Sequence, residues 1–262
     1  MDLQLLNNIC FYDVETTGVV AKGLEWDKDF MSFPKVVQLS WYINGIEKDY
    51  IIQPEGWEIP PEVVAIHGIS TEMAHEKGVP FASIIDEFIE DCEHAYLLIG
   101  HNIYFDTSIL KAMILRIMGR EYYDRKVDSA LYKGKRIDTM YKTIKFVGAK
   151  KANGAGGKFP SLVELYAKVF DGATFPAHNS LEDVRALVRC IPFLVENGLI
   201  ELAQKQYEPK QLKIQSVEET KIEFVDKPIT PIDNLQAEAQ LNIYSILGNN
   251  NVNSELLNDI DI

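Results

Sequence analysis

Four carboxylates and one histidine, placed in three short segments, have the residue types and spacing of a metal-dependent hydrolytic site. They are Asp13, Glu15, Asp106, His178 and Asp183. Carboxylate oxygens are the ligands that Mg²⁺ and Mn²⁺ prefer, and a neutral imidazole can accept a proton from water. If the fold brings the five side chains together, they form a site that could cleave a phosphodiester bond.

Residues 9–15 predict the strand that would carry the first two carboxylates. The run is largely apolar, and residues two apart on a strand point to the same face, so Asp13 and Glu15 should converge. An isolated pair of this kind is often only a solvent-facing strand end. Here the preceding residues look buried, so the two acids would need a neutralising partner.

Asp106 is predicted in the first turn of a helix. Residues 96–99 form a short apolar run typical of a strand, and apolar residues recur at helical spacing over 105–118. An acid in a first turn can simply complement the helix dipole, which contributes about 0.3–1 kcal/mol. Asn102 can likewise be read as a turn residue only.

His178 and Asp183 flank the predicted start of the last helix. Residues 180–183 resemble a capping box, and apolar spacing predicts a helix over 181–191 that Pro192 should end or kink. Asp183 could then be only an N-terminal helix acid. On one helix the two residues would lie about 140° apart, so they share a site only if His178 precedes the helix on a loop.

Taken together and in this order, the segments resemble the three motifs of the DEDD exonuclease superfamily, over roughly residues 8–195. The resemblance is to its DEDDh branch, the proofreading-exonuclease and ribonuclease T group. The sister branch has a tyrosine four residues before the last aspartate, where this chain has Asn179. The resemblance implies that Asp13, Glu15, Asp106 and Asp183 bind two Mg²⁺ or Mn²⁺ ions, with His178 as the general base.

Further segments look similar to accessory parts of the same family. They are His67 to Ile69, Ile137 to Thr139, and Ser161 to Glu164. We expect substrate contacts from residues around the site and from a glycine-rich basic loop that follows them. These are Thr16, Thr17, Gly18, His67, Asn102, Lys150 and Lys151. The loop could equally be a surface segment with solvated lysines.

The remaining pattern predicts an α/β fold of the ribonuclease H type, a mixed sheet flanked by helices. Residues 36–43 and 46–52, joined by Asn44-Gly45, predict a hairpin with a type I′ turn. With strand 9–15 it makes an antiparallel three-strand start. Helices are expected near 61–66, 71–77, 81–94, 105–118, 138–146, 161–170 and 181–191.

Composition predicts one main domain, residues 1–205, and an acidic tail or appended arm, residues 206–262. From Glu201 onward the chain holds 11 acidic and 5 basic residues, together with three prolines. Gln240 to Tyr244 in the tail resembles the peptide by which bacterial replication proteins bind the sliding clamp. The alternative is that this apolar stretch packs onto the main domain.

Charge and cysteine content limit the partners and the compartment. The net charge of −13 disfavours broad duplex binding but is compatible with capture of a nucleic-acid 3′ end by bound metals and a local basic segment. Three cysteines without C-x-x-C spacing predict neither a disulfide framework nor a zinc site. The start of the chain does not resemble a signal peptide, and no apolar run is long enough to span a membrane, so a cytoplasmic location is expected.

The predicted function is a metal-dependent 3′–5′ exonuclease. It would act on single-stranded DNA ends in proofreading or repair and release nucleoside 5′-monophosphates. A 3′ exoribonuclease of the same branch is an alternative, because the motifs do not separate the two sugars. A non-catalytic subunit that binds a DNA polymerase or clamp is a further alternative, disfavoured by the intact set of five residues.

Overall fold

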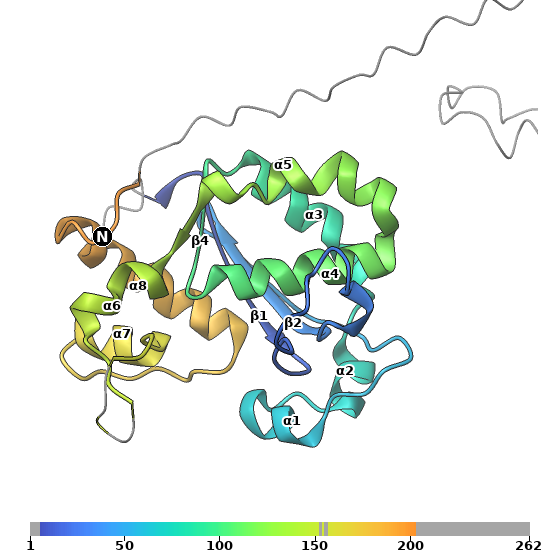
Figure 1. The fold of residues 1–262 in the computed structure, drawn as a ribbon, viewed down its shortest axis with the longest axis horizontal. Coiled ribbons are helices and arrows are strands. Elements are labelled where there is room, and N and C mark those ends of the chain that lie inside the picture. The colour runs from blue at the N-terminus through green and yellow to red at the C-terminus, as the bar shows by residue number, and fades with distance from the viewer. Residues whose placement is uncertain (1–5, 152–153, 155–156, 203–262) are drawn as a thin grey trace, which may run out of the picture. The chain divides into compact units, whose positions relative to one another are not determined.

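A computed structural model describes residues 6–151, 154 and 157–202 (Figure 1). A five-stranded mixed sheet forms its centre, in the order β3-β2-β1-β4-β5. The strands are β1 (Ile9–Thr16), β2 (Val36–Ile43), β3 (Ile46–Ile51), β4 (Leu97–Gly100) and β5 (Arg136–Asp138). β1, β2 and β3 pair antiparallel, whereas β4 pairs parallel with both β1 and β5. The predicted mixed sheet with an antiparallel three-strand start is confirmed.

The β2–β3 hairpin has the predicted two-residue turn. Ile43 pairs with Ile46, and between them Asn44 and Gly45 have φ angles of 52° and 84°. Positive φ at both central residues defines the type I′ turn, which asparagine and glycine adopt with the least strain. The turn therefore sets the register between β2 and β3.

Helices cover both faces of the sheet. They are α1 (Pro61–His67), α2 (Thr71–Lys77), α3 (Phe81–His94), α4 (Ile103–Tyr122), α5 (Asp128–Ala130), α6 (Thr139–Val147), α7 (Leu162–Val169) and α8 (Ser180–Glu196). Each helix predicted from apolar spacing is present, with ends that differ by a few residues. α4 is interrupted at Gly119, whose φ of 80° and ψ of 173° are not helical, close to where the sequence pattern predicted the helix to end.

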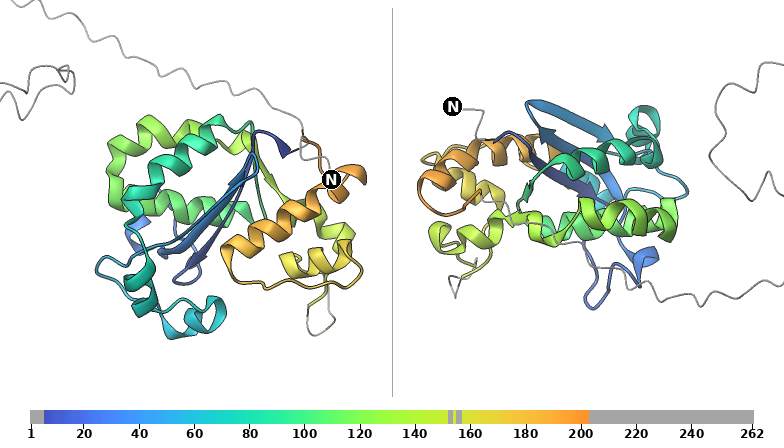
Figure 2. Two further views of the ribbon diagram at one scale, coloured as in Figure 1. Left: turned by 180° about the vertical axis from the view of Figure 1, so that it is seen from behind. Right: turned by 90° about the horizontal axis from the view of Figure 1, so that it is seen from above.

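Helices lie on both sides of the sheet (Figure 2), and alternation along β1 divides the core into two layers. Cys10, Tyr12 and Val14 pack in one cluster with residues of α3 and α4. Ile9 and Phe11 pack on the other face in a cluster with residues of α7 and α8. Asp13 and Glu15 continue the second series, so they face the side of the sheet that α8 covers.

Two sequence expectations differ from the structure. Of the two outcomes predicted for Pro192, an end or a kink, the end is wrong, because the last helix continues to Glu196. Ile191 and Leu194 are buried against the sheet on either side of it, and this packing outweighs the hydrogen bond that proline removes. β5 is not among the predicted elements, and Asp138 belongs to this strand and not to the helix predicted over 138–146, because three residues carry too little pattern to predict pairing.

Within the described residues, no helix combines the length and apolar character needed to cross a membrane. The predicted tail, residues 206–262, and its segment Gln240 to Tyr244 lie outside the described residues.

Candidate active site

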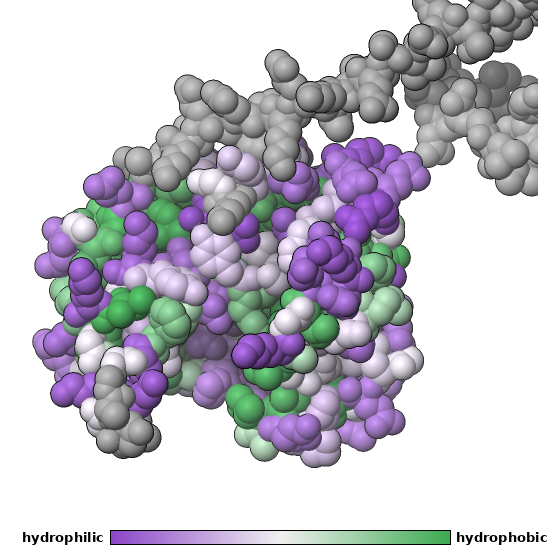
Figure 3. Space-filling model, viewed as in Figure 1, coloured by the Kyte–Doolittle hydropathy of each residue, from purple (hydrophilic) through white to green (hydrophobic). Residues whose placement is uncertain are grey.

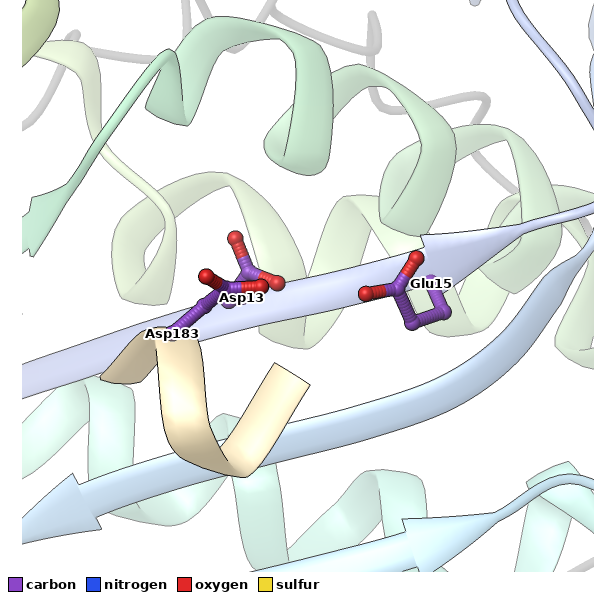
Figure 4. Close-up of side chains that lie close together, drawn as sticks. All are labelled: Asp13, Glu15 and Asp183. Carbon is purple, nitrogen blue, oxygen red and sulfur yellow. The ribbon is translucent and has the colours of Figure 1, made fainter. Parts of the chain in front are cut away.

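Three carboxylates converge where β1 ends and α8 begins. Oxygens of Asp13, Glu15 and Asp183 all lie within 4.8 Å of one another. Asp13 and Glu15 extend from the same face of β1, and Asp183 reaches toward them from the first turn of α8 (Figure 4). The convergence predicted from the D-x-E spacing is therefore present, and a segment about 170 residues away in sequence completes it.

Polar residues of β2 attach the start of α8 to the sheet. Ser40 and Gln38 pair with Asp13 and Glu15 in the β1–β2 register. The backbone N–H of Ser180 donates to Gln38 Oε1 (3.2 Å), and the hydroxyls of Ser180 and Ser40 lie 2.6 Å apart. These bonds hold α8 beside the two carboxylates of β1.

Ser180 is consequently not the helix cap that the sequence predicted. Asn179 caps α8 instead, with its side-chain oxygen accepting from the Glu182 N–H (3.3 Å). Ser180 is fully buried and its hydroxyl is used in the contact with Ser40. Local sequence fits either residue as a cap, and the tertiary contact with β2 decides between them.

His178 precedes α8 on a loop, as the shared site requires. Its φ of 66° places it in the left-handed region, and its backbone N–H donates to Asp183 Oδ2 (3.1 Å). The side chain is exposed. Backbone strain at a non-glycine residue is characteristic of functional sites, since surrounding contacts must maintain it.

Asp106 adjoins this cluster from the other side. It lies in the first turn of α4 and is 4% exposed. The charge of Asp106 contributes to the electrostatics of Asp13, and that of Glu15 to those of Asp106. A 2.6 Å hydrogen bond between the hydroxyls of Tyr12 and Thr107 joins β1 to α4 next to both residues.

All four carboxyl groups have raised pKa values. Burial is the main cause for each, and mutual repulsion adds to it for Asp13, Glu15 and Asp106. The pKa of Glu15 rises to about 7. Burial raises the pKa of Asp183 to about 6, although the His178 N–H and the charge of His178 act in the opposite direction. The cluster therefore resists ionisation without a counter-charge.

Asp138 belongs to the site scaffold, and sequence reasoning placed it only in an accessory segment. Its Oδ1 accepts from the N–H groups of Asn102 and Met140, both at 3.0 Å, so it links the starts of α4 and α6. Its Oδ2 is buried without a hydrogen-bond partner in the described part of the chain. After burial, the charge of Asp138 also contributes to the raised pKa of Asp106. An aspartate at the start of the helix predicted over 138–146 was the signal available.

The residues after Glu15 form a tight, internally bonded turn. The Thr16 hydroxyl donates to the Gly18 carbonyl (2.7 Å), and the Thr17 hydroxyl accepts from the Lys35 N–H (2.9 Å). Gly18 has a φ of 150°. The Thr17 side chain is thus used within the fold, whereas the backbone of the turn borders the carboxylates.

His67 lies at the end of α1, close to this turn. Its Nδ1 accepts from the Ile69 N–H (3.1 Å), which leaves Nε2 as the donor nitrogen. Nε2 is buried without a hydrogen bond of normal geometry among the described residues. Burial lowers the pKa of His67, and the charge of His178 lowers it further, whereas the Thr16 carbonyl raises it. His67 therefore lies near both Thr16 and His178.

Asn102 lies at the start of α4, four residues before Asp106, whereas the two predicted lysines are not brought into contact with the carboxylates. Asn102 caps α4 in the left-handed conformation, with a φ of 72°. Lys150 and Lys151 are exposed on the segment between α6 and α7. Among the interactions of the described residues, none joins either lysine to the four carboxylates.

The donor set fits a hard divalent cation. Asp13, Glu15 and Asp183 offer oxygen ligands at a spacing that one ion can bridge, and Asp106 stands beside them. Burial raises the pKa values of all four groups, mutual repulsion adds to this for Asp13, Glu15 and Asp106, and bound cations would relieve the repulsion. The space-filling view shows a recess with hydrophilic side chains in its depth, between the part that carries α6 and α7 and the part that carries α1 (Figure 3).

Comparison with known proteins places this fold and site in a family of nucleases. The model of the RNase T exonuclease family matches residues 10–191. The chain belongs to this exonuclease family, and the predicted family is confirmed. The family needs divalent metal ions, in agreement with the acidic cluster. No curated protein sequence matches the chain.

Solved structures of exonuclease I share the fold. A complex of E. coli exonuclease I with a dT13 oligonucleotide has 17% identity and a TM-score of 0.54, covering 71% of this chain and 40% of that one. Exonuclease I from Methylocaldum szegediense has 21% identity and a TM-score of 0.52, covering 73% of this chain and 41% of that one. A zinc-bound complex of E. coli exonuclease I with single-stranded DNA has 16% identity and a TM-score of 0.53, covering 72% of this chain and 40% of that one. The chain thus spans less than half the length of these proteins.

Proposed function

We propose that this chain hydrolyses single-stranded DNA from its 3′ end and releases nucleoside 5′-monophosphates, in proofreading or repair. The observation that carries the proposal is the convergence of Asp13, Glu15 and Asp183 within 4.8 Å, beside the buried Asp106. A cluster of this kind suits phosphoryl chemistry, in which negative charge develops on phosphate oxygens.

In the proposed site Asp13, Glu15, Asp106 and Asp183 hold two Mg²⁺ or Mn²⁺ ions. When bound, such ions polarise the scissile phosphate and make water more acidic. The carboxylates would hold the ions and remain ionised through contact with them. The buried scaffold of β1, α4 and α8 would keep the carboxylates in place, so little reorganisation is needed when substrate binds.

His178 is the proposed general base. It takes a proton from the attacking water as the new bond between water oxygen and phosphorus forms and the bond from phosphorus to the 3′ oxygen breaks. The shortened strand leaves with that 3′ oxygen. The hydrogen bond from the His178 N–H to Asp183 Oδ2 (3.1 Å) ties the loop to the carboxylate cluster, so His178 and Asp183 are positioned by one contact.

Substrate contacts are proposed from the groups that border the carboxylates. They are Thr16, Thr17, Gly18, His67 and Asn102, with Lys150 and Lys151 on the segment between α6 and α7. The support is strongest for His67, whose buried Nε2 has no normal hydrogen bond among the described residues and could donate to a phosphate or a terminal hydroxyl.

DNA is favoured over RNA because the solved complexes of exonuclease I contain DNA oligonucleotides. A 3′ exoribonuclease is the second candidate, since carboxylate geometry does not distinguish the sugars. A cytoplasmic location is proposed with either substrate. It agrees with Cys10, Cys92 and Cys190 being free, buried thiols, as expected in a reducing compartment.

The test compares degradation of matched DNA and RNA oligonucleotides labelled at the 5′ end. The expected result is a ladder that shortens from the 3′ end with Mg²⁺ or Mn²⁺, faster for DNA, and no cleavage with EDTA. Equal or faster degradation of RNA would favour the exoribonuclease. Absence of cleavage with either metal would favour a non-catalytic subunit that binds a polymerase or clamp.

A further inference from the structure

Three large aromatic side chains form a connected, exposed row next to the candidate active site. Tyr104, Tyr141 and Phe159 are 37%, 51% and 51% exposed. The ring centroids of Tyr104 and Tyr141 lie 6.3 Å apart, and those of Tyr141 and Phe159 lie 4.9 Å apart, both in edge-to-face arrangements. We call these three residues the aromatic row.

Core packing does not account for the aromatic row. Single exposed apolar residues are common on protein surfaces. Here the three rings come from separate segments, the first turn of α4, the first turn of α6 and the residues before α7, and they contact one another at the surface. A surface assembled in this way suits a ligand with flat apolar faces.

The scaffold of the row is also the scaffold of the site. The carboxylate of Asp138 interacts with the backbone amides of Tyr104 and Tyr141, as well as with that of Asn102. His101 Nε2 donates to the Pro160 carbonyl (2.9 Å) and holds the segment that carries Phe159. Tyr104 and Asp106 both lie in the first turn of α4, so the row begins two residues from a carboxylate of the site.

The charge around the row is opposite to that of the whole chain. Residues 141–160 hold five lysines and no acidic residue, in a protein of net charge −13. Lys142 and Lys158 are exposed and adjoin Tyr141 and Phe159 in sequence. Lys158 is paired with Glu164 (2.9 Å), whereas no ion pair of the described residues involves the exposed Lys142 or Lys145 of α6. The Arg136 guanidinium lies 5.0 Å from the centroid of the Tyr104 ring. Aromatic rings flanked by cations are the usual means of binding single strands, in which bases stack and phosphates meet positive charge.

We propose that the aromatic row stacks unpaired bases of the substrate strand just upstream of the 3′-terminal nucleotide. This stacking proposal rests on the proposed function and adds the surface by which the enzyme would select single-stranded substrates. Bases in a duplex are stacked on each other and cannot reach the rings, so the row would favour single-stranded ends. Stacking accepts any base, so no sequence preference is expected.

The main variant is the double substitution Tyr141→Ala with Phe159→Ala, which leaves Tyr104 and the carboxylates untouched. Removing a stacking ring weakens binding by roughly 5- to 150-fold per base. We therefore expect KM for a twelve-nucleotide DNA strand to rise by at least about tenfold, with kcat and the cleavage of a dinucleotide unchanged. The double substitution Tyr141→Phe with Phe159→Tyr keeps both rings, so its KM should stay close to that of the wild-type enzyme.

A matched control and a modified substrate separate stacking from general effects. Ile46 is 56% exposed and lies at the β2–β3 turn, so Ile46→Ala should leave KM unchanged. Abasic sites at the second to fourth positions from the 3′ end should raise KM of the wild-type enzyme. If the rings stack on those bases, the same abasic sites should have little further effect in the double variant.

The outcomes distinguish this proposal from the proposed function. Wild-type protein that degrades no oligonucleotide contradicts the function itself. Active wild-type protein with an unchanged KM in the double variant overturns the stacking proposal, including the case in which the row binds a protein instead. Additive effects of the abasic sites and the alanine substitutions would also overturn it. A loss of kcat on the dinucleotide would mean that the row shapes the site and does not bind the strand.

Discussion

The hydroxyl oxygens of Ser40 and Ser180, 140 positions apart in sequence, lie 2.6 Å apart and join the central sheet to the helix that carries Asp183. The Ser40 hydroxyl donates to Asp49 Oδ1 (2.6 Å), so Ser180 must be the donor in the contact between the serines. The result is a directed chain from α8 through β2 to β3. It fixes α8 against the strand that pairs with Asp13.

The direction of this chain predicts unequal effects of two similar substitutions. Ser180→Ala removes one donor and should lower the free energy of unfolding by about 0.5–1.5 kcal/mol. Ser40→Ala leaves the buried Ser180 hydroxyl without its acceptor and removes one of the two donors to Asp49 Oδ1, the other being Gln38 Nε2 (2.8 Å), so a larger loss of about 1–3 kcal/mol is expected. Both should reduce nuclease activity through misplacement of Asp183. Chemical denaturation and rate measurements check this, with Ser83→Ala, an exposed hydroxyl, as control.

Asp13→Asn should abolish cleavage and leave the metal-free protein as stable as wild type or slightly more stable. The substitution removes one charge from a group of mutually repelling carboxylates while keeping the size of the side chain. Thermal melting in EDTA is measured beside nuclease rates. The matched control is Asp124→Asn, at an exposed position on the segment after α4. Near-normal cleavage by the Asp13 variant would remove this residue from the proposed site.

His178→Ala should lower the rate by about 10²–10⁴ and retain metal affinity, because a general base contributes about that much and is not a ligand. His94→Ala, at an exposed histidine near the end of α3, serves as control. Binding of Mn²⁺ is followed by calorimetry. A variant that no longer binds Mn²⁺ would show that His178 is a ligand, in disagreement with the proposed role.

The stability of the metal-free protein should fall as pH rises toward neutrality. Glu15 has its pKa raised from 4.5 to about 7 in the folded state. The folded protein therefore binds more protons than the unfolded chain between these values, and the free energy of unfolding decreases with pH across that window. Asp183, with a pKa of about 6, adds to the decrease.

Melting temperatures measured in EDTA across this pH range check the sign. Glu15→Gln should flatten the decrease, since it removes the titrating group. Added Mg²⁺ should raise the melting temperature most at neutral pH, where the carboxylates are ionised. A melting temperature that rises with pH in EDTA, by the same amount in wild type and variant, would contradict the repulsion inferred from the cluster.

Removal of the tail after residue 205 should leave hydrolysis of a short single-stranded oligonucleotide nearly unchanged. The five proposed catalytic residues and the aromatic row all lie before that point. In the full chain, Leu241→Ala with Tyr244→Ala tests whether Gln240 to Tyr244 binds a sliding clamp. Loss of clamp binding with unchanged melting would support docking. A lower melting temperature in a protein without clamp affinity would instead indicate packing onto the nuclease domain.

Much of the site could be predicted from the sequence because its parts obey short-range rules. The alternation of a strand is enough to place Asp13 and Glu15 on one face. Helical spacing is enough to place Asp106 and Asp183 in first turns, and the Asn44-Gly45 turn determines the hairpin register. Each of these features depends on neighbours within a few residues, so a short stretch of sequence is enough to predict it.

Tertiary structure decided what depends on segments far apart. Whether Ser180 caps α8 or contacts Ser40 is not encoded locally, because both uses satisfy the same hydroxyl. Asp138 resembles an ordinary helix cap until the fold places it between the starts of α4 and α6. The aromatic row exists only when three segments meet at the surface. Long-range contacts of this kind are set by the packing of the whole core, which no short window of sequence contains.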